Sequence, residues 1–192
     1  MKVALSFLLV RAMLLLVLLS QPAFGAEAAK EISLIERTIL DGKASIAVPA
    51  VFSLMSDEMR KLKYPNENRP AVVYTDERGA VNVAVNLTAL SVSPDQLEAT
   101  HETVVTNFRN LYPSAAWYES RLFEREGQRF FVIDLMTPAI DTEVRNMMLG
   151  TSCGGRLLVV SFNVMRELAP AWTETGHKIL SSLKIRCDDL KT

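Results

Sequence analysis

The sequence predicts an α+β protein in which an antiparallel β-sheet is flanked by helices on both faces. Three observations lead to this fold. Short apolar runs are separated by turn residues, as in hairpin-connected antiparallel strands. Residues 94–111 and the segment that begins near residue 169 have the apolar spacing of amphipathic helices. Residues 130–135 and 157–160 are apolar on both strand faces, as expected of a sheet that is covered on both sides.

Residues 1–25 have the features of a cleavable secretory signal peptide. They contain two basic residues, no acid, a short apolar block, and Ala23 and Gly25 at the −3 and −1 positions. The alternative is an uncleaved membrane anchor, but the uncharged run of residues 12–26 is shorter than the ~20 residues that span a bilayer. We therefore expect cleavage after Gly25, with Ala26 and Ala28 as the alternative ends, and no stable membrane span in the mature protein.

The first predicted hairpin turns at Asp41-Gly42, because this dipeptide supplies the positive φ that a type I′ turn requires. Its second strand covers residues 43–48 and stops at Pro49. The expected organisation of the chain is a signal peptide (1–25), a polar lead-in (26–35), a single α/β domain (36–187) and a tail (188–192).

A short helix is predicted next, over residues 54–62. Ser53 is its expected N-cap, and Met55, Met59 and Leu62 are expected on one face. Residues 64–70 then have the proline and asparagine content of a loop.

A second hairpin joins residues 71–75 to residues 81–87. Valines at 81, 83 and 85 alternate with polar or small residues, so they are expected on one buried face of the second strand.

The segment 94–111 carries the clearest helix signal. Ser93, Pro94 and Gln96 match a capping box with proline at the first helical position, and Pro113 ends the pattern. Four strands and a final helix complete the prediction, at residues 116–124, 129–137, 144–153, 157–164 and from residue 169 onward.

Composition narrows the classes of function. The chain of 192 residues has 21 basic and 22 acidic residues, a formal net charge of −1. Loss of the leader with its two basic residues changes this charge to −3, which argues against a nucleic-acid ligand. His101 and His177 are the only histidines and belong to no metal-binding or catalytic motif. We therefore expect no catalytic residues, no metal and no cofactor.

Cys153 and Cys187 are the only cysteines. In an oxidising compartment an isolated pair is expected to form a structural disulfide, which would tie the C-terminal segment to a strand. Two free thiols are the alternative, and a redox-active pair would favour a C-x-x-C spacing that is absent.

Two further polar features are open to a structural and a functional interpretation. Asp134 interrupts an apolar strand, and we expect it to pair with an arginine such as Arg145. His101 lies on the apolar stripe of the 94–111 helix, which favours a partly buried structural role. The competing hypothesis is an enzyme that uses Asp134 or His101.

Residues 42–49, 73–83 and 179–185, with the Gly127-Gln128 turn, resemble the DcrB-like family of bacterial cell-envelope proteins, which share the PsbP/Mog1-like architecture. The resemblance covers residues 36–186 and implies a sheet between helices. It also implies a role in envelope maintenance or phage uptake. Relatives of this family serve as chaperones for secretion-system effectors. It implies no catalytic residues, and the chain departs from the family in lacking a lipobox cysteine.

The predicted function is that of a periplasmic, non-enzymatic module that binds another protein or an envelope component. Recognition is expected at the sheet edge or around the 64–70 loop, with a possible partner surface at Arg60, Lys61, Lys63 and Tyr64. The alternatives are an immunity protein, a chaperone for a secretion-system effector, and a lipid-binding module. Extracellular release and anchoring through an uncleaved N-terminus are the alternatives for its location.

Overall fold

The computed structural model describes residues 32–187. The predicted signal peptide, most of the predicted lead-in and the predicted tail (188–192) lie outside the described residues.

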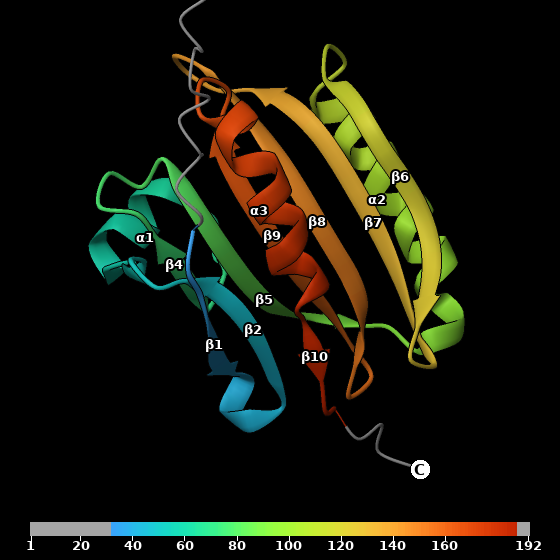
Figure 1. The fold of residues 1–192 in the computed structure, drawn as a ribbon. Coiled ribbons are helices and arrows are strands. Elements are labelled where there is room, and N and C mark those ends of the chain that lie inside the picture. Colours follow the sequence, from blue (N-terminus) through green and yellow to red (C-terminus); the bar gives the residue numbers. More distant parts are fainter. Residues whose placement is uncertain (1–31, 188–192) are drawn as a thin grey trace, which may run out of the picture. The chain divides into compact units, whose positions relative to one another are not determined.

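A seven-stranded antiparallel sheet is the centre of the described domain (Figure 1). Its strand order is β3-β4-β5-β9-β8-β7-β6. The pairing of β5 with β9 joins two hairpin systems that are far apart in the sequence. The strands are β3 (Ser53–Leu54), β4 (Val72–Thr75), β5 (Val81–Ser91), β6 (Ala116–Arg125), β7 (Gln128–Pro138), β8 (Glu143–Cys153) and β9 (Arg156–Met165).

A second sheet has three strands in the order β1-β2-β10. The predicted first hairpin forms β1 (Leu34–Ile39) and β2 (Ala44–Pro49), and β10 (Lys184–Ile185) pairs with the other edge of β2. The smaller sheet therefore brings the start and the end of the described chain together.

The helices cover both faces of the large sheet, as predicted (Figure 1). α3 (Ala169–Ser181) packs on one face together with the smaller sheet, and their buried side chains form one core. α2 (Leu97–Leu111) packs on the opposite face over β6, β7 and β8. The short α1 (Asp57–Lys63) packs beside β4 and β5.

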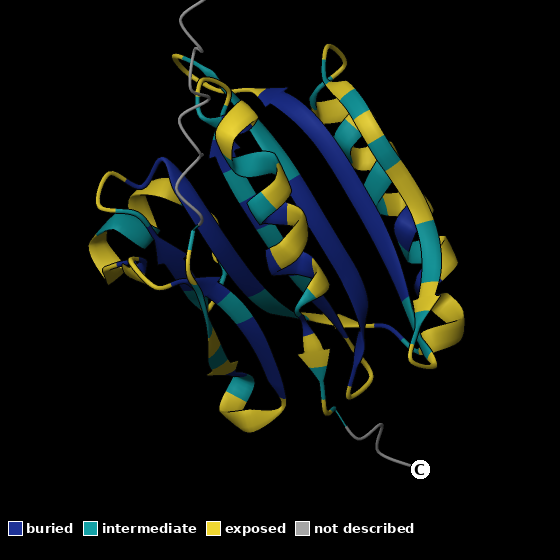
Figure 2. Ribbon diagram, viewed as in Figure 1, coloured by how far each residue is buried: buried dark blue, intermediate teal, exposed yellow. Residues whose placement is uncertain are grey.

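Strand β7 shows why the sequence lacks alternation there. Phe130 and Val132 belong to the core under α3, whereas Phe131 and Ile133 belong to the core under α2. Figure 2 shows the middle strands of the sheet as mostly buried. A strand with apolar cover on both faces needs no polar face, so its sequence reads as a continuous apolar run.

The prediction for the first helix is wrong in its boundary. The helix is capped by Ser56, whose Oγ accepts a hydrogen bond from the Met59 N–H at 3.2 Å, and not by Ser53. Ser53 instead pairs with Thr75 as part of the short edge strand β3. Leu62, predicted on the buried face, is 80% exposed, whereas Met59 of the same predicted face packs against the core around Val73.

The first hairpin is confirmed, but its turn is longer than the predicted two-residue turn. A short 3₁₀ turn covers Leu40–Gly42, and Leu40 and Asp41 both have positive φ values, 55° and 53°. Aspartate tolerates this left-handed conformation better than most residues, but leucine does not, so the sequence pattern pointed to the shorter turn.

The predicted capping box of the long helix is confirmed. The Gln96 side chain accepts a hydrogen bond from the Ser93 N–H at 3.0 Å, and a 3₁₀ turn over Pro94–Gln96 leads into α2. Leu97 and His101 face the sheet and are buried.

Candidate functional site

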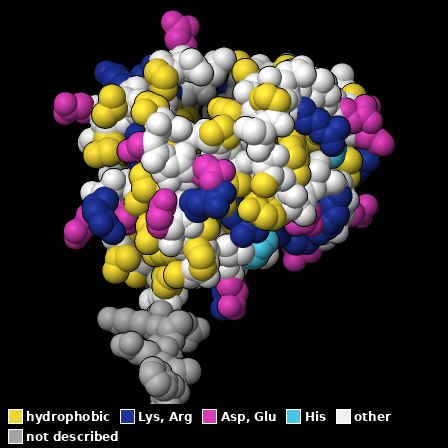
Figure 3. Space-filling model, turned by 90° about the horizontal axis from the view of Figure 1, so that it is seen from above, with side chains coloured by type: hydrophobic (Ala, Val, Ile, Leu, Met, Phe, Trp, Pro, Cys, Tyr) yellow, Lys and Arg dark blue, Asp and Glu magenta, His cyan; other side chains and the backbone are white. Residues whose placement is uncertain are grey.

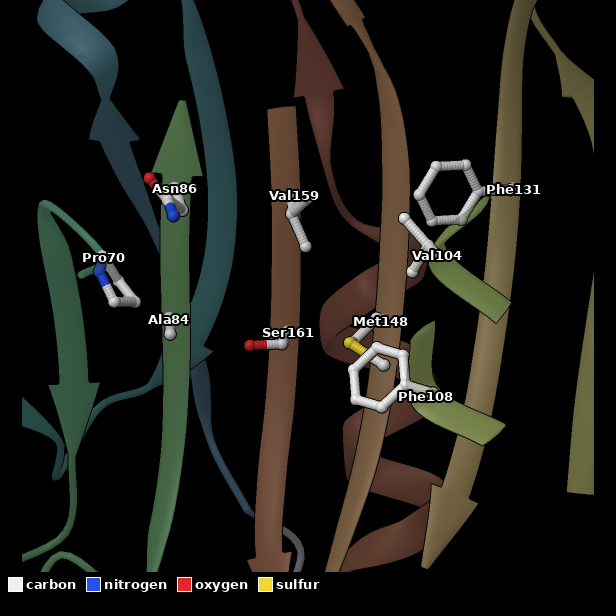
Figure 4. A pocket seen from close by; sticks show the side chains of 9 residues that line it. All are labelled: Pro70, Ala84, Asn86, Val104, Phe108, Phe131, Met148, Val159 and Ser161. Atoms are coloured by element: carbon white, nitrogen blue, oxygen red, sulfur yellow. The ribbon is translucent and has the colours of Figure 1, made fainter. Parts of the chain in front are cut away.

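A groove opens on the α2 face of the large sheet, where neither α1 nor α2 covers the middle strands. It has a volume of about 230 Å³. Figure 4 shows Val104 and Phe108 of α2 on one side and Pro70 on the other, with strands β5 and β9 between them. The lining residues are Pro70, Ala84, Asn86, Val104, Phe108, Phe131, Met148, Val159 and Ser161. We call this the apolar groove.

Strand register explains the floor of the groove. Ser161 on β9 pairs with Ala84 on β5 and with Met148 on β8, which places these residues in one row across the sheet. Val159 lies two residues further along β9, on the same face, and is only partly buried. Small residues at Ala84 and Ser161 leave space that larger side chains would fill.

Gly150 shapes the neighbouring part of the floor. It pairs with Phe131 on β7, and a Cβ atom added at Gly150 would lie 1.9 Å from the Phe131 ring. The absence of a side chain therefore lets the Phe131 ring occupy the space beside Gly150 on β8. An isolated glycine inside a strand is a signal of close approach by another group, and Gly150 carries this signal within the predicted strand 144–153.

A row of three asparagines borders the apolar groove. Asn163 on β9 pairs with Asn82 on β5 and with Asn146 on β8, two residues beyond the row that contains Ser161. Asn82 Oδ1 accepts hydrogen bonds from Asn163 Nδ2 and from the Tyr64 hydroxyl, each at 2.9 Å. Among the described residues, none donates to Oδ1 of Asn163 or of Asn146. The asparagine row therefore retains amide groups that can bond to a ligand.

The predicted partner surface lies beside this row, and most of its groups bond to the chain itself. Arg60 forms an ion pair with Asp57 at 2.6 Å, and Lys63 Nζ donates to the Gly79 carbonyl at 2.5 Å. Tyr64 is partly buried, and this burial raises its pKa to about 12. Lys61 is exposed and forms no hydrogen bond within the described residues. The structure thus brings Tyr64 to the asparagine row and leaves Lys61 in solvent.

The two cysteines lie at disulfide distance. Cys153 ends β8, Cys187 follows β10, and their Cα atoms are 5.1 Å apart. This separation is within the usual range for a disulfide. The bond would join the large sheet to the smaller one at the end of the described chain.

His101 connects α2 to β6. Its Nε2 lies 2.9 Å from the Ser120 hydroxyl, and its ring packs against Phe131 with the centroids 5.5 Å apart. Burial lowers the pKa of His101 below the ordinary value of 6.5, because it disfavours the charged imidazolium. These contacts match the structural role expected from the sequence.

The lowered pKa of His101 predicts that the protein loses stability as the pH falls below about 6.5. The unfolded chain takes up the proton first, so acid favours unfolding until the folded state is also protonated. We expect the urea midpoint to be lower at about pH 5.5 than at about pH 7.5, and His101→Gln to reduce this difference. The exposed His177 provides the control, His177→Gln, which should retain the full difference. An unchanged difference in His101→Gln would contradict the assignment.

Asp134 pairs with Arg145, as predicted. The guanidinium donates two hydrogen bonds to the carboxylate, at 3.0 Å from Nε and 2.7 Å from the terminal nitrogen. Arg145 also donates to the Thr173 hydroxyl on α3 at 2.9 Å and lies over the Tyr118 ring. Donation of these hydrogen bonds to the Asp134 carboxylate raises the pKa of Arg145. The buried carboxylate thus fastens α3 to the sheet.

Within residues 32–187, no three histidine, cysteine or acidic side chains gather into a group that could hold a metal ion. No helix among these residues is both long and apolar enough to cross a bilayer. On the face of the domain in Figure 3, basic and acidic side chains are interspersed with hydrophobic ones.

Comparison with solved structures defines the class of fold. The cyanobacterial PsbP protein of Synechocystis sp. PCC 6803 matches with a TM-score of 0.58 and 11% identity, over 81% of this chain and 94% of its own. LpqN of Mycobacterium tuberculosis, involved in cell envelope biogenesis, matches with a TM-score of 0.50 and 10% identity, over 81% and 91%. No protein-family model and no curated protein sequence matches the chain significantly.

The chain therefore has the α+β fold of the PsbP/Mog1-like class, as the sequence predicted. At these identities the likeness extends to the fold alone. The closer resemblance to the DcrB-like family stays a prediction.

Proposed function

We propose that this protein is an exported, non-enzymatic accessory module of the bacterial cell envelope that binds a partner protein in the apolar groove. The observation that carries the proposal is the open groove between α2 and Pro70. There the sheet, which is otherwise covered on both faces, leaves the apolar side chains of Val104, Phe108 and Val159 only partly buried. Burial of such side chains is the main favourable contribution to protein association.

The dimensions of the groove favour a side chain of a protein partner over a small-molecule ligand. Its volume of about 230 Å³ is below the ~300 Å³ at which pockets for drug-sized ligands begin. A pocket of this kind suits one large apolar side chain, the type of anchor that dominates many interfaces. The asparagine row lies two residues away, so its amides can bond to the backbone of the same segment.

Two further observations support a location in the envelope. The N-terminal 25 residues have the pattern of a secretory leader, and the only two cysteines lie at disulfide distance. The fold is also that of LpqN, which is involved in cell envelope biogenesis. We propose the periplasm as the compartment and an envelope protein as the partner.

The alternative hypothesis of an enzyme receives little support from Asp134 and His101, the two residues on which it depends. The Asp134 carboxylate already accepts two hydrogen bonds from Arg145 and is 2% exposed. His101 is buried against Phe131 and lies on the far side of the sheet from Asp134, as the two separate cores show. They therefore form no common catalytic pair.

Capture of the partner tests the proposal. Tagged protein is incubated with periplasmic and membrane extracts of the source bacterium, and the bound proteins are identified by mass spectrometry. Val159→Lys places a charge in the groove and should reduce the yield of the specific partner at least about tenfold, equivalent to about 1.4 kcal/mol. Val51→Lys is the matched control, because Val51 is 80% exposed and lies outside the groove.

Equal capture by wild type and Val159→Lys would contradict a role for the groove. Extraction of the purified protein with organic solvent provides the second measurement. A lipid that is extracted from the wild type but not from Val159→Lys would show that the groove binds a lipid and not a partner protein. Both variants must first show a cooperative unfolding transition like that of the wild type.

A further inference from the structure

A second cavity lies at the start of β9, beside the cysteine pair, and three basic side chains line it. Its volume is about 360 Å³. Three segments that are distant in the sequence contribute Lys43, Arg156 and Arg186 to its lining, together with Leu87 and the two cysteines. We call this the basic cavity.

Hydrogen bonds to the backbone hold the Arg156 guanidinium in place, and a backbone contact joins the segments that carry Lys43 and Arg186. Arg156 donates from Nε to the Thr88 carbonyl at 2.7 Å and from a terminal nitrogen to the Leu87 carbonyl at 2.9 Å. A guanidinium has five N–H donors, so donors remain for a ligand. The Arg186 N–H donates to the Lys43 carbonyl at 2.7 Å, which fixes these two residues beside each other.

The basic cavity has an excess of positive charge in a chain that is slightly acidic overall. Among the described residues, no acid lines it, and none of its three basic side chains has a carboxylate within 4.0 Å. The nearby Glu36 is occupied, since it accepts from the Ser45 hydroxyl at 2.6 Å and pairs with Lys184 at 3.4 Å. Asp188 and Asp189 follow in the sequence but lie outside the described residues.

We propose that the basic cavity binds the phosphoryl group of a phosphate-bearing ligand. Arginine and lysine together are the usual protein ligands of phosphate, since arginine offers paired donors and lysine a compact charge. The volume of about 360 Å³ is within the range of small-molecule sites, so it can hold a phosphate with an organic substituent. This site is separate from the apolar groove, with which it shares no lining residue.

Two sources of the phosphoryl group are distinguished by two probes. Glycerol 3-phosphate and inorganic phosphate are titrated into the purified, oxidised protein by isothermal calorimetry. Flotation with vesicles of phosphatidylglycerol in phosphatidylcholine, against vesicles of phosphatidylcholine alone, tests a lipid headgroup. Saturable binding of a soluble probe identifies a free phosphate or phosphate ester, whereas flotation only with phosphatidylglycerol identifies the headgroup.

Both probes are tested on the double variant Lys43→Gln with Arg186→Gln. Arg156 is left unchanged, because its guanidinium also bonds to the backbone. The double variant should weaken binding at least about tenfold. The matched control is Lys61→Gln with Arg78→Gln, which removes the same charge from exposed residues outside the cavity and should bind within about twofold of wild type. The proposal is overturned if neither probe binds, if the cavity variant binds like wild type, or if the control loses as much.

Discussion

Replacement of Asp134 by asparagine is expected to destabilise the protein by about 3–5 kcal/mol. Asp134 and Arg145 have side-chain exposures of 3% and 16%, so the substitution would leave a largely buried guanidinium without its counter-charge. It would also weaken the link from Arg145 to Thr173 on α3. Urea unfolding at neutral pH measures the effect as a lower midpoint with an unchanged slope.

A double replacement separates the effect of removing the whole charge pair from the effect of leaving one charge unpaired. Asp134→Leu with Arg145→Met removes both charges together, and apolar replacement of a whole buried pair usually costs much less than removal of one partner. We expect the double variant to be more stable than Asp134→Asn. If Asp134→Asn is as stable as wild type, the pair does not hold α3 on the sheet as described.

Removal of the cysteine pair is the second large effect that we expect. A bond between Cys153 and Cys187 closes a loop with a sequence separation of 34 residues, which corresponds to about 3–4 kcal/mol from the lower entropy of the unfolded chain. Cys153→Ala with Cys187→Ala should lower the free energy of unfolding by about this amount. Reductant should lower the midpoint of the wild type and leave that of the double variant unchanged. A wild-type midpoint that does not respond to reductant would show that the thiols are free.

Local signals account for most of the elements that the sequence predicts. The capping box at Ser93 and Gln96 fixes the start of the 94–111 helix, because a cap satisfies N–H groups that the helix cannot. The start of the first helix differs from the prediction because serine is a favoured N-cap residue and stands at both position 53 and position 56. Only the pairing of Ser53 with Thr75 decides between them, and that contact is distant in sequence.

Long-range pairing is the part of the fold that the pattern did not reveal. β3 and β10 have two residues each, too few for any periodicity. The third strand of the smaller sheet depends on the pairing of β10 with β2, across most of the chain. No local propensity encodes such a partner.

The candidate site was predicted only near its rim. The 64–70 loop was expected to take part in recognition, and Pro70 does line the apolar groove. The floor was missed because Ala84, Val159 and Met148 each read as ordinary core residues. That they line a groove depends on where α2 ends its cover of the sheet, which is a property of packing between distant elements.

Photocrosslinking from inside the groove tests whether a partner binds there. A photoreactive amino acid is placed at position 159 or, as control, at position 51, and living cells that produce the protein are irradiated. We expect one discrete crosslinked product with an envelope protein from position 159, absent from position 51 and from unirradiated cells. Products that are the same from both positions, or none from position 159 while partner capture persists, would contradict binding in the apolar groove.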